Sequence, residues 1–272
     1  MKKHLLILFV LNLLILPVLA QSTKPAHDRS SKWYVYWGWN RGWYTNSDLH
    51  LQGDGYNFNL ADVKAQDRPS ELSLKNYLFF TSLTVPQTNV KAGYHFSDKY
   101  SVALGFDHMK YVVEQYQTTI IDGTINVGDS EYNGTYQNQE IELKRNFLRY
   151  EHTDGLNYVF LEFNRHDRLL DKDKLQISTV FGASPAFLRP RTDVTFLNVQ
   201  GPNVYHFAGY GINAKFGLDI LLFNRLSLMS EVKGGYINLP DVRATLNPNE
   251  KVSQHFSFLQ ANFILGFVFS VK

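Results

Sequence analysis

Four histidines lie near the same end of predicted strands, where they could carry out acid–base chemistry. They are His108, which follows an aspartate, His152, which follows a glutamate, and His206 and His255, which each open a segment. Cleavage or transfer of an acyl group needs a histidine together with a serine or a carboxylate. No serine stands out as a nucleophile, and histidines at such positions commonly belong to interfacial hydrogen-bond networks. We therefore predict no catalytic residue and no enzymatic activity.

A second candidate site is an acidic loop with Asp122, Asp129 and Glu131 among glycines. Carboxylate oxygens of this kind can bind a hard cation. The spacing does not match the calcium-binding EF-hand loop, and polar turns like this one are usually solvated. The glycine pairs at 209–211 and 234–235 lie inside strands, so they indicate close packing rather than phosphate binding. We predict no metal site and no cofactor.

A third set of residues is charged and falls on one face of the predicted strands. It consists of Lys91, Asp107, Glu162, Lys215, Asp219, Glu231 and Lys233. In a barrel of eight strands the interior is just wide enough to be filled by side chains. An isolated buried charge is very costly, so these groups should pair with one another. The set predicts a packed polar network in the lumen. The same residues could instead line a narrow path for water or ions, or form a ligand-binding site.

The elements that must position this network are strands in which apolar residues alternate with small or polar ones. The predicted strands span residues 32–44, 88–96, 100–113, 156–165, 175–187, 205–223, 226–238 and 255–272. Three short turns, at 97–99, 166–174 and 224–225, alternate with four long polar connections. This pattern predicts an all-β, antiparallel, up-and-down transmembrane β-barrel of eight strands. Ten strands would result if residues 147–153 or 140–143 joined the wall.

The last strand shows the alternation best, because residues 255–272 present one continuous apolar face. A strand in a soluble protein has about 5–6 residues, whereas one that crosses a bilayer needs about 9–11. The segment therefore suits a lipid-facing strand that closes a barrel. After residue 20, no run of about 18 apolar residues remains that could form a helical span.

The first twenty residues predict export. Lys2 and Lys3 precede an apolar run over residues 5–19, and the small residue Ala20 follows. This is the pattern of a signal peptide cleaved after Ala20, since the run is short for a membrane anchor. We assign residues 1–20 to the signal peptide, 21–31 to a short periplasmic segment and 32–272 to the barrel. The chain has no cysteine, so disulfides cannot stabilise it.

The amino-acid composition limits the classes of molecule that the protein is expected to bind. Without Lys2 and Lys3, the 27 basic residues become 25, equal to the 25 acidic ones, and this neutrality argues against nucleic acid. Aromatic residues make up 15% of the chain, which suits rings gathered at membrane interfaces. The connection over residues 45–86 is about forty residues long, and loops of that length are uncommon unless they are functional or disordered. Its aromatic residues, Tyr56, Phe58, Tyr77, Phe79 and Phe80, could cover the barrel mouth or bind a surface ligand.

Together, the signal peptide, the eight alternating strands and the aromatic terminal strand resemble the small outer-membrane β-barrels of Gram-negative bacteria, the OmpA/OmpX/OmpW-like group. The resemblance implies contact with outer-membrane lipid and lipopolysaccharide, and recognition of the C-terminal strand by the barrel-insertion machinery. Members often end on an aromatic residue, whereas here Phe267 and Phe269 are followed by three further residues. We predict a structural or surface-interaction protein. Passage of small or hydrophobic molecules and modification of lipids are the two alternatives.

Overall fold

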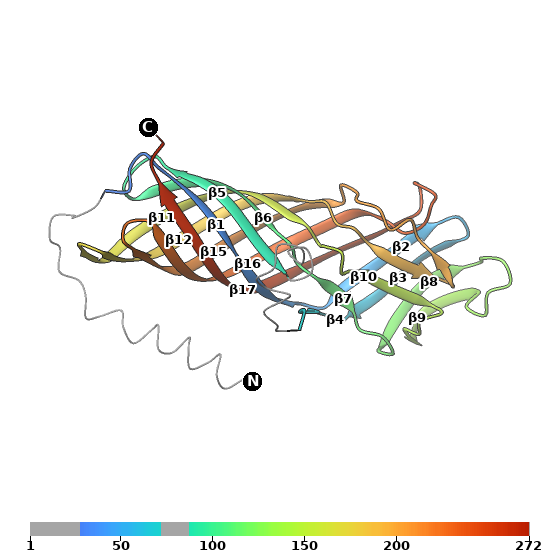
Figure 1. The fold of residues 1–272 in the computed structure, drawn as a ribbon. Coiled ribbons are helices and arrows are strands. Elements are labelled where there is room, and N and C mark those ends of the chain that lie inside the picture. Colours follow the sequence, from blue (N-terminus) through green and yellow to red (C-terminus); the bar gives the residue numbers. More distant parts are fainter. Residues whose placement is uncertain (1–27, 72–86, 272) are drawn as a thin grey trace.

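The protein is seen in a computed structural model that describes residues 28–71 and 87–271. Seventeen β-strands are present in this part of the chain (Figure 1). No helix among the described residues is long and apolar enough to cross a membrane. The predicted signal peptide and the aromatic residues Tyr77, Phe79 and Phe80 lie outside the described residues.

Eight strands form a closed antiparallel ring, which confirms the predicted fold class. In order around the ring they are β1 (Lys32–Tyr44), β5 (Thr88–His95), β6 (Tyr100–Asp107), β11 (Tyr158–Lys172), β12 (Leu175–Leu188), β15 (Gly209–Leu222), β16 (Leu226–Arg243) and β17 (Lys251–Phe269). The ring closes where β1 pairs with β17, from Trp33 opposite Phe269 to Tyr44 opposite Phe258. Closure matters because an unpaired edge would leave backbone groups unsatisfied in lipid.

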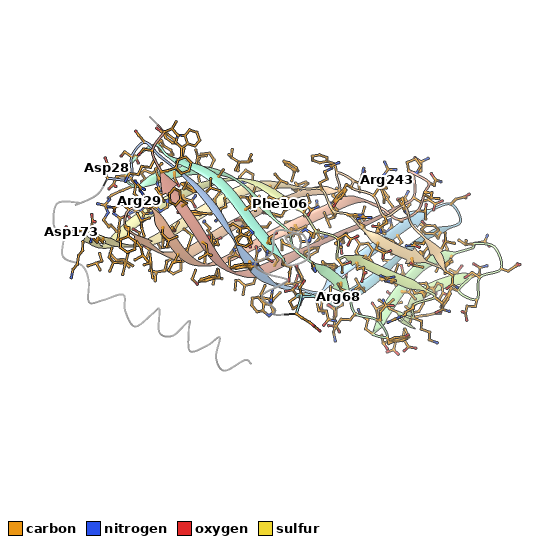
Figure 2. The ribbon with its side chains drawn as sticks, in the orientation of Figure 1. Asp28, Arg29, Arg68, Phe106, Asp173 and Arg243 are labelled. Carbon is orange, nitrogen blue, oxygen red and sulfur yellow. The ribbon has the colours of Figure 1, made fainter. Side chains whose placement is uncertain are left out.

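The two ends of the barrel differ. At the end we call the turn end, the strands are joined by short connections such as Asp173 and Lys174, and both Arg29 and the last described residue, Val271, lie there (Figures 1 and 2). At the opposite loop end, the four predicted long connections leave the wall. The sequence predicts polar loops there, and the structure adds that parts of all four connections belong to strands.

Two small sheets, which we call the extension, continue the barrel beyond the loop end (Figure 1). One contains β2 (Ser47–Gly53), β3 (Tyr56–Val63), β8 (Thr118–Ile125) and β9 (Gly134–Glu142), and it joins the wall where β2 pairs with Lys251–Gln254 of β17. The other contains β4 (Ala65–Gln66), β7 (Tyr111–Val113), β10 (Leu148–His152), β13 (Asp193–Phe196) and β14 (Val199–Gln200). An apolar core stabilises the extension, with the rings of Phe58, Phe147 and Phe196 in mutual contact.

Several predicted boundaries are corrected by these pairings. The third strand ends at Asp107, because Tyr111–Val113 pair with β4 and β10 in the extension. Residues 140–143 and 147–153 also contribute to the extension, so the ring has eight strands rather than ten. The strand β11 continues to Lys172, which reduces the predicted turn at 166–174 to two residues. The strand predicted over 205–223 starts only at Gly209, as β15, and Ala208 just before it is buried.

The outer face of the wall is apolar, with aromatic residues near both ends (Figure 2). Leu104 and Ile212 are among the most exposed apolar side chains of the wall, at 63% and 62%. Exposed rings near the turn end belong to Trp33, Phe96, Tyr100, Phe223 and Phe267, and those near the loop end to Trp43, Phe187, Phe207, Tyr210 and Tyr236. An apolar band between two aromatic girdles is the surface of a barrel that crosses a membrane.

Glycines on the inner face leave room for large aromatic side chains in the lumen. The ring of Phe160 lies against Gly105 of the neighbouring strand, and that of Tyr36 against Gly266. A Cβ atom at either glycine would collide with the ring beside it. Close packing therefore explains these glycines, and the rings fill the space between the charged groups.

Candidate functional site in the barrel lumen

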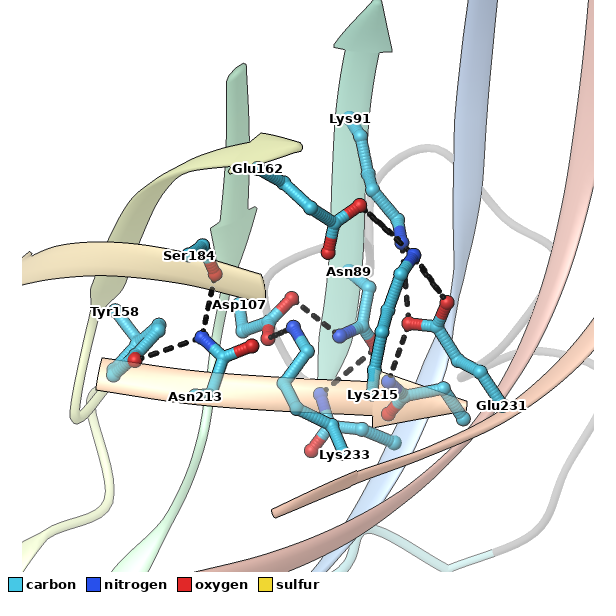
Figure 3. Close-up of polar contacts among 12 residues, drawn as sticks. Asn89, Lys91, Asp107, Tyr158, Glu162, Ser184, Asn213, Lys215, Glu231 and Lys233 are labelled. Atoms are coloured by element: carbon cyan, nitrogen blue, oxygen red, sulfur yellow. Dashed lines mark hydrogen bonds and ion pairs between the residues drawn. The ribbon is translucent and has the colours of Figure 1, made fainter. Parts of the chain in front are cut away.

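The centre of the lumen holds four charged side chains that contact one another, Lys91, Glu162, Lys215 and Glu231 (Figure 3). The Lys91 Nζ atom lies 3.4 Å from Glu162 Oε1 and 3.1 Å from Glu231 Oε2. The Lys215 Nζ atom lies 2.8 Å from an oxygen of each glutamate. All four side chains are buried. We call them the central quartet.

The central quartet forms because each of its members sits at an inward position of a different strand. Lys91 comes from β5 and Glu231 from β16, and two other strands, β1 and β17, separate these two in the ring. Their ion pair therefore crosses the lumen instead of following the wall. The Asn262 side chain donates a hydrogen bond of 2.9 Å to Glu231, which fixes that carboxylate from a further strand. The quartet thus cross-links the barrel from inside.

A second ion pair lies on the loop-end side of the quartet. The Lys233 Nζ atom is 2.5 Å from Asp107 Oδ2 and 4.1 Å from the centre of the Phe160 ring. Asn89 donates a hydrogen bond to the other oxygen of Asp107 (Figure 3). Because the ring face is electron-rich, it stabilises the ammonium group together with the carboxylate.

A third ion pair closes the turn end, and one of its members was not predicted. Arg29, which precedes the first strand, reaches into the barrel, where its Nη1 atom lies 2.6 Å from Asp219 Oδ2. The Arg29 side chain also donates to Gln176, and Ser227 donates to the other oxygen of Asp219 at 2.5 Å. Only 1% of Arg29 is exposed. Within the segment 21–31, this residue therefore belongs structurally to the lumen.

The structure places all seven predicted lumen residues inside the barrel, at three levels. The central quartet and the Lys233–Asp107 pair account for six of them, and Asp219 pairs with Arg29 instead. The seven carry three positive and four negative charges, so one negative charge has no partner among them. That imbalance was the available signal for Arg29. With it, four cations balance four anions, and each of the eight side chains contacts an opposite charge.

Aromatic side chains fill the lumen toward the extension. The ring of Tyr158 packs on Phe258 with centroids 5.7 Å apart, and Tyr111 stacks on Phe256 at 4.7 Å. The Tyr158 hydroxyl accepts a hydrogen bond of 2.8 Å from Asn213 (Figure 3). These rings belong to the apolar core of the extension, so that core continues into the barrel mouth.

The four candidate histidines do not form a common site. His108 bonds to Asn157 at 3.1 Å, and His206 bonds to Asp241 at 3.0 Å. His255 contacts the Tyr236 ring, and His152 is buried in the extension. Within residues 28–71 and 87–271, no hydrogen bond or ring contact joins any two of these four histidines, and no group of three potential metal ligands is found. In the acidic loop, Asp122 and Glu131 accept hydrogen bonds from different asparagines, Asn138 and Asn146.

We expect His152 to make the extension sensitive to acid. Its Nδ1 atom lies 2.9 Å from the Thr192 hydroxyl, and burial lowers its pKa to about 3. An unfolded histidine has a pKa of about 6.5, so between about pH 6.5 and 3 the unfolded extension binds more protons than the folded one. The contribution of His152 to stability is therefore complete above pH 6.5. At about pH 5 it should have fallen by about 2 kcal/mol.

This loss is measured by unfolding the extension with urea at about pH 7 and at about pH 5. Susceptibility to protease cleavage serves as the readout of unfolding. Replacing His152 with glutamine should reduce the pH dependence of the midpoint. Replacing Gln52, a residue of β2 without an ionisable side chain, with alanine provides the control and should leave the pH dependence unchanged. An equal pH dependence in wild type and His152→Gln would contradict the assignment.

One cavity lies on the outer side, where the extension meets the barrel. It has a volume of about 200 Å³ and is lined by residues of the β1–β2 connection and of β2, β3, β16 and β17, including Asn46, Asp48, Asp62, Tyr236 and His255. Part of its wall thus comes from the segment 45–86, for which the sequence predicts a surface ligand. Asp62 is held in a left-handed backbone conformation, with φ at 55°. Such a conformation is uncommon for a residue with a side chain.

No family model and no curated protein sequence matches the chain. Among solved structures, it is similar to the outer membrane protein OprG from Pseudomonas aeruginosa, with 12% identity over 91% of this chain and 100% of that one and a TM-score of 0.45. The N-terminal β-barrel domain of Pseudomonas aeruginosa OprF matches at 9% identity over 89% and 100%, with a TM-score of 0.32. The attachment invasion locus protein Ail of Yersinia pestis matches at 10% over 86% and 99%, with a TM-score of 0.31. The strand pairing of this chain by itself closes the barrel.

Proposed function

We propose that this protein is an integral outer-membrane barrel of a Gram-negative bacterium, with a packed and non-conducting lumen. Its role is structural or consists of surface interactions made by the extension. The observation that carries this proposal is the interior, where four cations and four anions pair at three levels inside a closed wall. Aromatic packing at one end and Arg29 at the other leave the lumen filled along its length.

The outer face supports insertion in a membrane. Its exposed apolar side chains would be costly in water over so large an area, whereas they match the hydrocarbon core of a bilayer. Barrels of this kind keep their short turns on the periplasmic side and their long connections outside. In that orientation, residues 21–31 are periplasmic and the extension projects from the cell surface. The export signal at 1–20 and recognition of the C-terminal strand by the insertion machinery belong to the same proposal.

The extension supports a role in surface interactions. It is a packed structure with an apolar core of its own, so it can present fixed side chains to a partner. Its strand β9 lies at the edge of its sheet and is mostly exposed. An exposed edge strand can pair with an added strand of a ligand, and the cavity beside Asp62 offers a second contact.

Planar-bilayer recordings on the refolded protein test whether the lumen is closed. We expect no steady single-channel current, because a path for ions would have to break buried ion pairs at each level. A shift in gel mobility on heating would show that the protein in the recording was folded. Steady, reproducible channels from folded protein would refute the packed lumen and favour passage of small molecules.

A further inference from the structure

The outward face of β12 changes from apolar to basic at the loop end. Phe181 and Phe187 point outward and are 49% and 41% exposed. The next two outward positions of the same chain segment are occupied by Arg189 and Arg191. The outward side chains thus change from apolar to basic within two residues. The strand direction is kept there, because Arg191 forms a β-bridge with Tyr205 and its amide donates to the Gly155 carbonyl at 3.0 Å.

The position of this change matches the surface of a membrane. From Leu175 to Phe187 the strand rises about 40 Å, at about 3.3 Å per residue. At a tilt of about 40° this corresponds to a depth of about 30 Å, close to the apolar band of about 25 Å in outer-membrane barrels. Arg189 and Arg191 therefore come just after the apolar band ends. In the orientation proposed above, this is the outer leaflet.

The two arginines converge on one aromatic ring. The guanidinium carbons of Arg189 and Arg191 lie 5.6 and 5.9 Å from the centre of the Tyr205 ring, which is itself half exposed. Arg191 also contacts Asp154 at 3.3 Å and donates to the Asn203 carbonyl at 3.1 Å. In the described part of the chain, no ion pair involves Arg189. One of the two positive charges is thus unneutralised, and the other is shared with an exposed carboxylate.

An apolar surface begins directly beside this pair. The ring of Phe207 stacks on Phe187 with centroids 5.0 Å apart, and Tyr210, 57% exposed, follows on the neighbouring strand. His206 and Asp241 pair close by at 3.0 Å. Cationic groups at one end of an exposed aromatic surface match a molecule with an anionic head and acyl chains.

We propose that Arg189, Arg191 and Tyr205 bind a phosphate group of lipopolysaccharide in the outer leaflet, with its acyl chains along Phe187, Phe207 and Tyr210. Guanidinium groups suit this ligand because their planar donors match phosphate oxygens. The Tyr205 ring holds both arginines in place, so less side-chain freedom is lost when the phosphate binds. This proposal depends on the membrane insertion proposed above.

Binding of purified bisphosphorylated lipid A to the refolded full chain, measured by native mass spectrometry, tests this proposal. The double variant R189Q/R191Q should bind lipid A about 30-fold more weakly, since each basic residue at an anionic membrane surface contributes about fivefold. The variant R165Q/R225Q removes two exposed arginines at the turn end and should bind like wild type. Lipid A without its phosphates should bind wild type and R189Q/R191Q equally.

Two outcomes would overturn the site. One is an equal loss of affinity in both double variants, which would indicate a general charge effect. The other is displacement of lipid A by inorganic phosphate alone, which would indicate a simple anion site without acyl-chain contacts. Flotation of each protein with liposomes is measured separately. Failure of wild type to float would refute membrane insertion, whereas normal flotation with unchanged lipid A binding by R189Q/R191Q would refute only the site.

Discussion

Replacing Glu231 with alanine is expected to destabilise the folded barrel by about 3–5 kcal/mol, the usual cost of removing one member of a buried ion pair. Glu231 contacts Lys91 at 3.1 Å and Lys215 at 2.8 Å. Its removal leaves two buried lysines with only Glu162 between them, so one positive charge has no counter-charge. It also removes the acceptor for Asn262. The loss of stability is measured by unfolding the protein with urea in detergent micelles. The shift in gel mobility reports the folded fraction.

The control for this experiment does not restore the missing glutamate. It removes one lysine, so that the remaining buried charges balance. Combining Glu231→Ala with Lys215→Met leaves Lys91 paired with Glu162, and methionine is close to lysine in size. We expect this double variant to recover most of the lost stability, because well-packed apolar groups can replace a buried ion pair at little cost. If the double variant were as unstable as the single one, the loss would reflect packing rather than charge.

Replacing Arg29 with methionine should cost about 3 kcal/mol, although this residue lies outside every strand. The substitution leaves the Asp219 carboxylate buried with Ser227 and without a cation. It also removes the donor to Gln176. Deleting residues 21–31 should destabilise the barrel to a similar extent. The same urea titration measures both changes.

Neighbouring residues provide the comparison for Arg29. Asp28 is exposed and hydrogen-bonds only at the surface, so Asp28→Ala should change stability by less than about 0.5 kcal/mol. Combining Arg29→Met with Asp219→Asn removes the unpaired charge and should restore most of the stability. Full stability of Arg29→Met by itself would show that the N-terminal segment does not hold the turn end closed.

The barrel and its lumen could be predicted because strand side chains alternate with a period of two. Once a strand is recognised, that period assigns Lys91 or Glu231 to the inner face without knowledge of any contact. Arg29 could not be found this way, because it precedes the first strand and belongs to no alternating pattern. His166 was assigned to a turn, since it starts a run of charged residues, yet it is buried in the middle of the longer strand β11.

The extension was harder to predict because its strands are short and interrupted by polar residues. Tyr56, Phe58 and Leu60 alternate on β3, but the asparagines between them and the two glycines just before them, at 53 and 55, are typical of loops. What makes this segment a strand is pairing with β2 and β8, and β8 is more than fifty residues away. Such long-range pairing has no local signal in the sequence. The apolar residues of the segment were visible, but their partners were not.

The strand β17 has a mechanical consequence. It runs without a break for 19 residues and pairs with β1 and β16 in the wall and with β2 in the extension. A strand of that length spans about 60 Å, roughly twice the thickness of the hydrocarbon layer. The extension is therefore joined to the barrel through a continuous, hydrogen-bonded strand. In the proposed orientation, a ligand bound at its tip would be held at a fixed distance from the outer leaflet, and force applied to the tip would be transmitted along β17 into the barrel wall.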